Sequence, residues 1–147
     1  MEPDLNKRYQ TMLTLWFALL MSVGMYFLFI QFAAPAIARQ PENQRDSLLI
    51  AGLTVLGMCL ILVSFAVKRK LLERSIEKQD VFLVQKAMVI ACALCEVSAL
   101  LGLLSRLVVG SRQYYWLFLL AAGGIVLHFP RRIQLEAASY KSRNIVN

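Results

Sequence analysis

Residues 47–67 read SLLIAGLTVLGMCLILVSFAV, a run of 21 residues without a charge that is followed at once by Lys68-Arg69-Lys70. A helix of roughly 20 apolar residues is long enough to cross the ~30 Å hydrocarbon core of a bilayer. Apolar residues occupy every side of such a helix here, as expected for a segment surrounded by lipid or by other apolar helices. The run therefore predicts a membrane span over 47–67, and the basic triplet predicts that the span ends at a membrane surface.

Three further runs of this kind lie on either side of that stretch. The first run has no charged residue between residues 9 and 38, and a later run covers 81–109 with three charged residues. The last run begins with the aromatic cluster Tyr114-Tyr115-Trp116, which is typical of a membrane interface. Hydrophobic residues make up 59% of the chain, against roughly 45–50% in a soluble domain. We therefore predict an all-α, polytopic membrane protein in which residues 1–147 form a single membrane domain, a four-transmembrane-helix bundle. The four spans are predicted at about 10–33, 47–67, 83–107 and 114–130.

The positive charges are distributed unequally between the two ends of these spans. Twelve of the sixteen Lys and Arg residues lie at the N-terminus, in the segment 68–80, at Lys86 or in the short tail 131–147. Because segments rich in Lys and Arg stay in the cytoplasm, both termini and the basic loop 68–80 are predicted to be cytoplasmic. Two alternatives for that loop are a short helix on the lipid headgroups and a solvated continuation of the second span. We expect a multi-pass protein of the bacterial inner (cytoplasmic) membrane.

The net charge of +7 comes from these membrane flanks, so it does not predict a nucleic-acid partner. A second interpretation exists for residues 1–38. Lys7-Arg8, the apolar stretch and Ala36-Ile37-Ala38 follow the order of a cleaved signal peptide, whose removal would leave three spans. The apolar stretch is longer than the roughly 7–15 residues of such peptides, which favours a retained span.

Glu96 is an acidic residue inside the third predicted span, close to its midpoint. A charged carboxylate at the centre of a membrane helix costs about 2.5–3.5 kcal/mol on an insertion scale. We therefore expect Glu96 to be either protonated or paired with a cation. Arg106 lies about 15 Å further along the helix, which is too far for a direct pair. Three roles remain open for Glu96: proton or ion handling, a hydrogen bond to another helix, and a contact to a partner subunit.

Small and polar residues are predicted to surround Glu96. At 100° per residue, one broad face of the third span carries Gln85, Cys92, Cys95 and Ala99 together with Glu96. The midpoints of the other spans are also small. Small residues let membrane helices approach closely, and they also leave room for a water molecule or a proton path. These midpoints are Ser22 and Gly24 in the first span, Gly57 in the second, and Gly123 and Gly124 in the fourth.

Cys92 and Cys95 form a C-x-x-C pair, and together with Cys59 and Glu96 they allow a redox or metal site to be drawn. Hydrocarbon disfavours a thiolate, so packing as small apolar residues is the favoured interpretation, and neither a metal nor a cofactor is predicted. His128 is interpreted as an interfacial residue at the cytoplasmic end of the fourth span. No nucleophile arrangement or phosphate-binding loop is recognisable, so no catalytic residue is assigned.

The stretch Ala93-Leu-Cys-Glu-Val-Ser-Ala-Leu-Leu-Gly-Leu-Leu104 resembles the carboxylate-bearing helix of the rotary ATPase proteolipid, the c or K subunit. The resemblance covers about a dozen residues. In that family a glutamate or aspartate among small residues, followed some six residues later by a glycine, carries the translocated proton or sodium ion. The resemblance implies that Glu96 is an ion carrier.

Two classes of function follow from the sequence. The first is a small multi-pass membrane subunit that handles protons or ions through a buried carboxylate. The second is a structural or assembly subunit of a larger, respiratory-type membrane complex, with no chemistry of its own. A membrane thiol-quinone oxidoreductase is a distant third. The expected partners are the lipid bilayer and either other membrane subunits or further copies of the chain.

Overall fold

The computed structural model of the chain describes residues 3–33, 44–110 and 113–139. These residues form five α-helices and no strand, which confirms the all-α prediction. Ala36-Ile37-Ala38, on which the signal-peptide interpretation depends, lies outside the described residues, as does the end of the tail from 140 to 147. The helices are α1 (Pro3–Ala33), α2 (Gln44–Lys78), α3 (Val81–Val109), α4 (Tyr114–Leu127) and α5 (Arg132–Ser139).

The helix α2 extends much further than the second predicted span. It continues through the basic segment to Lys78, so the prediction of a loop over 68–80 is wrong and the alternative of a continued helix is correct. Lys, Arg, Glu and Leu dominate this segment, and all four are good helix formers. The connection to α3 is only Gln79 and Asp80; Gln79 has a φ of 53°, and Asp80 accepts a hydrogen bond from the backbone N–H of Phe82 at 2.9 Å as the N-cap of α3.

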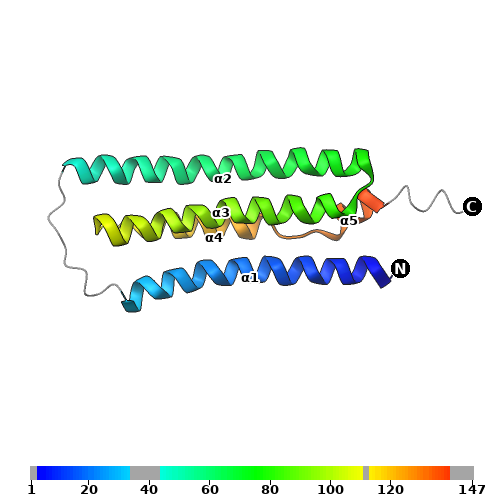
Figure 1. Cartoon of the computed structure of the whole chain (residues 1–147), viewed down its shortest axis with the longest axis horizontal. Coiled ribbons are helices and arrows are strands. Elements are labelled where there is room, and N and C mark those ends of the chain that lie inside the picture. Colours follow the sequence, from blue (N-terminus) through cyan, green and yellow to red (C-terminus); the bar gives the residue numbers. More distant parts are fainter. Residues whose placement is uncertain (1–2, 34–43, 111–112, 140–147) are drawn as a thin grey trace, which may run out of the picture.

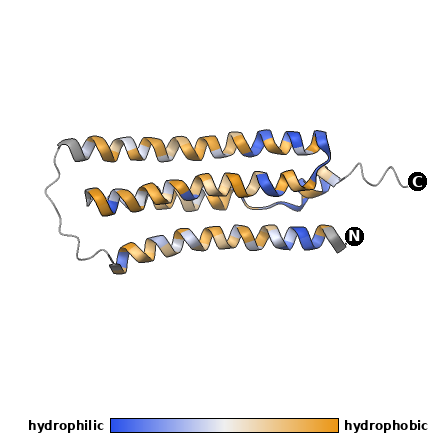
Figure 2. Cartoon of the chain, in the orientation of Figure 1, coloured by the Kyte–Doolittle hydropathy of each residue, from blue (hydrophilic) through white to orange (hydrophobic). Residues whose placement is uncertain are grey.

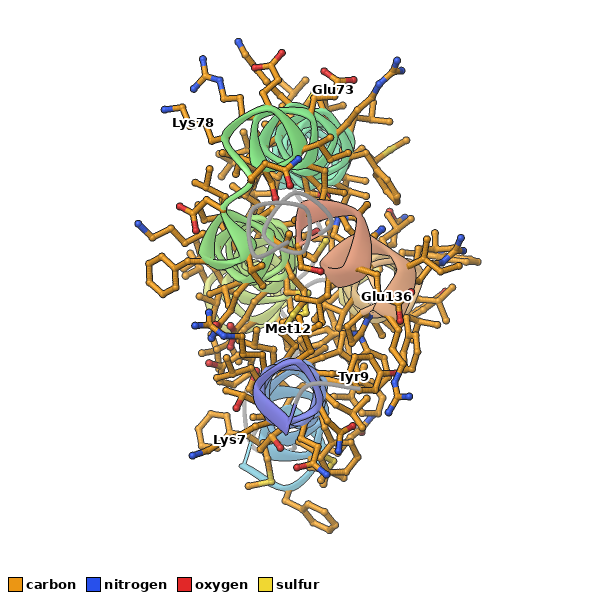
Figure 3. The ribbon with its side chains drawn as sticks, turned by 90° about the vertical axis from the view of Figure 1, so that its right-hand side faces the viewer. Lys7, Tyr9, Met12, Glu73, Lys78 and Glu136 are labelled. Atoms are coloured by element: carbon orange, nitrogen blue, oxygen red, sulfur yellow. The ribbon has the colours of Figure 1, made fainter. Side chains whose placement is uncertain are left out.

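The long helices lie side by side, with α3 in the middle (Figure 1). α3 packs against α1, α2 and α4, whereas no contact joins α1 to α2 in the described part of the chain. The end-on view shows α1 and α2 at opposite edges, with α3 on one side and α4–α5 on the other between them (Figure 3). This arrangement makes α3 the most enclosed span: 44% of its apolar window is buried, against 11% for α1 and 17% for α2.

Close helix packing depends on two of the predicted glycines. A Cβ atom on Gly57 of α2 would lie 2.6 Å from Leu117 Cδ2 of α4, and one on Gly124 of α4 would lie 2.7 Å from the Sγ of Cys95. Either position has room only for a hydrogen atom. Gly123 is exposed, and a Cβ atom there would meet nothing within 4 Å, as is also true of Gly24. Gly123 and Gly24 therefore take no part in this close packing.

The apolar surface of the helices agrees with a membrane environment. α1, α2 and α3 are each long and apolar enough to cross a bilayer, and α4 with α5 would make a fourth span if this bent pair is one span. Hydrophilic residues gather at the end where α1 begins and α2 ends (Figure 2). At this end Glu73 and Lys78 project outward from α2 (Figure 3).

Candidate functional site

Glu96 faces α1, where it meets two hydroxyl groups. Its Oε1 lies 2.6 Å from Ser22 Oγ and 3.0 Å from the hydroxyl oxygen of Tyr26. Ser22 and Tyr26 are four residues apart on a helix, so their side chains project from the same face of α1 one turn apart. The carboxyl group is thus held between α3 and α1, and all three side chains are partly buried.

The hydrogen atoms at this cluster can be arranged in two ways. Ser22 Oγ also lies 2.8 Å from the carbonyl oxygen of Leu19, but a serine hydroxyl has one proton to donate. If Ser22 donates to Glu96, the carboxylate is ionised and accepts from both Ser22 and Tyr26. If Ser22 donates to Leu19, a protonated Glu96 donates to Ser22 Oγ and accepts from Tyr26. Rotation of one hydroxyl group therefore adapts the cluster to either protonation state without moving a heavy atom.

The part of the chain that the structure describes offers Glu96 no ion-pair partner. Among the described residues, no Lys, Arg or His side chain lies within 4.0 Å of its carboxyl oxygens. Arg106 instead donates to the carbonyl of Gly110 at 3.1 Å and lies over the ring of Tyr114.

The other residues of the predicted face of α3 do not surround Glu96. Cys92, Cys95 and Ala99 are fully buried, and Gln85 is partly buried. Cys95 contacts Gly124 of α4 and Ser64 of α2, which places it on a different side of α3 from the contact with α1. The broad face predicted from the sequence is thus divided between two helix interfaces, with only Glu96 among these residues hydrogen-bonded to α1.

The three cysteines are free thiols, and Cys59 is exposed on α2. Within the described residues, no group of three His, Cys, Asp or Glu side chains is close enough to hold a metal ion. Cys92 and Cys95 are packed into the core around α3.

His128 is part of a second polar cluster, and its interpretation as an interfacial residue is wrong. The imidazole is fully buried, with Nε2 lying 3.0 Å from Ser64 Oγ. Ser64 Oγ also donates to the carbonyl of Ile61 at 2.6 Å and lies 3.5 Å from Cys95 Sγ. Phe65 packs edge-on against the imidazole, with ring centroids 4.4 Å apart. The histidine that follows α4, a serine of α2 and a cysteine of α3 therefore meet inside the protein.

The break after α4 explains why His128 is buried. The fourth span was predicted to run to residue 130, but α4 ends at Leu127 because Pro130 has no N–H to donate and restricts the residue before it. The axis of α5 is bent by 46° from that of α4. Side chains of other helices bond the carbonyls at this break: Trp16 Nε1 donates to Ile125 at 2.7 Å, and Lys68 Nζ donates to His128 at 3.3 Å.

Four site residues were not identified as such in the sequence. The sequence patterns indicate Ser22 only as a small residue, and they assign Tyr26, Ser64 and His128 to no site. Two signals were available. Ser22 and Tyr26 are hydroxyl residues one turn apart at the depth of Glu96, and His128 precedes a proline by two positions, as at a broken helix.

The fold and these two clusters define an all-α protein with three helices of membrane-spanning length and composition, or four if α4 and α5 form one broken span. Neither a protein-family model, nor a curated protein sequence, nor a solved structure matches the chain.

Proposed function

We propose that the chain is an integral membrane subunit that crosses a bacterial cytoplasmic membrane four times, with both termini in the cytoplasm. α4 alone has 14 residues, a length of about 21 Å, which is too short for a hydrocarbon core of about 30 Å. The fourth span therefore includes the break and part of α5. Hydrophilic residues gather at one end (Figure 2), where Lys and Arg outnumber Asp and Glu, and this excess of basic residues supports the proposed orientation.

Within this subunit, Glu96 binds and releases a proton. The observation that carries the proposal is the double contact of Glu96 Oε1 with Ser22 and Tyr26, which accommodates both protonation states. A site that cycles a proton needs both states to be accessible, and the hydroxyl of Ser22 compensates the change by exchanging its acceptor. The short resemblance of residues 93–104 to the carboxylate helix of rotary ATPase proteolipids points to the same role for Glu96.

The test compares the parent chain with Glu96→Gln after reconstitution into liposomes. Glutamine keeps an acceptor oxygen for Ser22 and Tyr26 but cannot bind a proton. We expect a hydrophobic carbodiimide to label residue 96 of the parent, with labelling that decreases as the pH rises. We also expect Glu96→Gln to abolish proton flux driven by a pH gradient. Equal proton flux in both proteins would refute the proposal.

A structural or assembly subunit is the second candidate function, and one observation favours it. Both hydrogen bonds to Glu96 join α1 to α3, across 74 and 70 residues of sequence. In this case Glu96 is an anchor between helices, and its partners are other membrane subunits or further copies of the chain. Glu96→Leu would then release a co-purifying partner while Glu96→Gln would not, because only the glutamine retains the hydrogen bonds.

A further inference from the structure

The connection between α4 and α5 is held by contacts to two other helices. Residues 128–131 lie outside both helices, and Pro130 within them is buried. Trp16 of α1 bonds the carbonyl of Ile125 and packs edge-on against the ring of Phe129, with centroids 5.1 Å apart. Lys68 and Ser64 of α2 bond the carbonyl and the imidazole of His128. A non-helical segment that depends on side-chain contacts is where a hinge is expected.

The hydrogen bonds identify the form of His128 that fits this position. Ser64 has one hydroxyl proton, and at 2.6 Å it is donated to the carbonyl of Ile61. Ser64 Oγ is then an acceptor, so the imidazole must donate to it from Nε2. Nδ1 consequently carries the lone pair of the neutral ring. Nδ1 is buried and has no hydrogen-bond partner among the described residues.

Protonation of His128 in place is opposed by its surroundings. A proton on Nδ1 would be a buried donor without an acceptor. From α2, Lys68 brings a positive charge to the backbone of the same residue, and Arg131 follows in the same connection. From α3, the thiol of Cys95 lies 3.5 Å from Ser64 Oγ, and from α1 the uncharged Trp16 bonds the carbonyl of Ile125. Arg132 of α5 is directed to Asn6 and to the ring of Tyr9.

We propose that His128 is a proton-operated latch: the neutral imidazole holds the α4–α5 connection against α2, and protonation releases it. The charged ring can lose its conflict with Lys68 only by leaving the buried position. Because the connection is already non-helical, it can move outward without breaking a regular helix. The proposal does not depend on the role of Glu96, which lies at the other interface of α3.

The latch can be tested with Trp16 as a reporter, because the chain has two tryptophans and Trp116 is exposed. The full chain carrying Trp116→Phe is placed in nanodiscs of zwitterionic lipid and titrated from roughly pH 8 to pH 3, a range that extends below that of an exposed histidine because the site opposes protonation. We expect the emission of Trp16 to shift to longer wavelength in one transition, as its contacts with Ile125 and Phe129 are lost. A constant emission over this range would overturn the proposal.

Two further variants assign the transition. His128→Gln keeps an amide donor for Ser64 but cannot be protonated, so its emission should not change with pH; an identical transition in this variant would contradict the latch. Lys68→Gln removes the neighbouring positive charge, and the transition should then move to higher pH by about one unit. This second variant leaves the imidazole in place, so the proposal remains testable if His128→Gln does not fold. An unchanged midpoint in Lys68→Gln would also contradict it.

Discussion

Ser22 Oγ lies 2.6 Å from Oε1 of Glu96 and 2.8 Å from the carbonyl oxygen of Leu19. The hydroxyl group therefore has two acceptors within hydrogen-bond distance but only one proton to donate. The same oxygen of Glu96 also receives the hydroxyl of Tyr26. Because these groups belong to α1 and α3, the cluster has a structural consequence whatever its chemistry. It fixes the rotation and the register of α1, which has few buried residues of its own.

Removing the hydroxyl of Tyr26 tests this structural contribution. Tyr26→Phe keeps the ring and deletes one hydrogen bond between α1 and α3, so the free energy of unfolding should fall by about 0.5–1 kcal/mol, the usual value for such bonds in membranes. Denaturation in mixed detergent micelles measures the change. Tyr115→Phe is the matched control, since Tyr115 is exposed. The free energy of unfolding of this variant should equal that of the parent chain. If both variants lose the same free energy of unfolding, the loss does not come from the hydrogen bond between Tyr26 and Glu96.

The adjacent glycines of α4 provide a second test. A Cβ atom on Gly124 would lie 2.7 Å from Cys95 Sγ, so Gly124→Ala should force α3 and α4 apart and lower the free energy of unfolding by about 1–3 kcal/mol. Gly123→Ala adds the same atom one residue earlier, where nothing lies within 4 Å. It should leave the stability unchanged or raise it by up to about 1 kcal/mol, because alanine is the better helix former. If the two variants lose stability equally, the packing of α3 against α4 described above is incorrect.

Patterns along one helix predicted the fold better than the site. The apolar runs identify α1, α2 and α3, because span length and charge are properties of a single segment. The position of Glu96 within α3 was predictable for the same reason. Its partners Ser22 and Tyr26 were not, because the side of α3 that faces α1 depends on how the helices are rotated against one another. A helical wheel gives no information about that rotation.

The end of α4 shows a different limit of the sequence. Hydropathy alone favours a continuous span to residue 130, and a histidine beside two arginines has the composition of an interface. The break caused by Pro130 instead turns His128 inward, where Ser64 provides a partner. The hydrogen bond from Trp16 to Ile125 depends on the same break. These contacts join residues far apart in the chain, so no local pattern predicts them.

The indole of Trp16 should contribute measurably to the stability of the break. Trp16→Phe keeps an aromatic ring beside Phe129 but removes the donor to the carbonyl of Ile125. We expect a loss of about 1 kcal/mol in the free energy of unfolding and faster hydrogen exchange in α5. Trp116→Phe, at an exposed position, should change neither quantity. If hydrogen exchange in α5 is unaltered in Trp16→Phe, the hydrogen bond of Trp16 at the break does not stabilise the packing of α5.

The proposed topology places the two ends of the helices on opposite sides of the membrane. Lys78 and Glu136 lie at the end where α1 begins (Figure 3), whereas α3 ends at the opposite end (Figure 1) and Gln113 follows it as the N-cap of α4. A membrane-impermeant maleimide added to sealed, right-side-out vesicles should therefore label Gln113→Cys and spare Lys78→Cys and Glu136→Cys, which react only after permeabilisation. The parent chain is the control, since Cys92 and Cys95 are buried and Cys59 lies on the apolar part of α2. Labelling of Glu136→Cys from the same side as Gln113→Cys would mean that α4 and α5 do not cross the membrane together, and the fourth span would have to be abandoned.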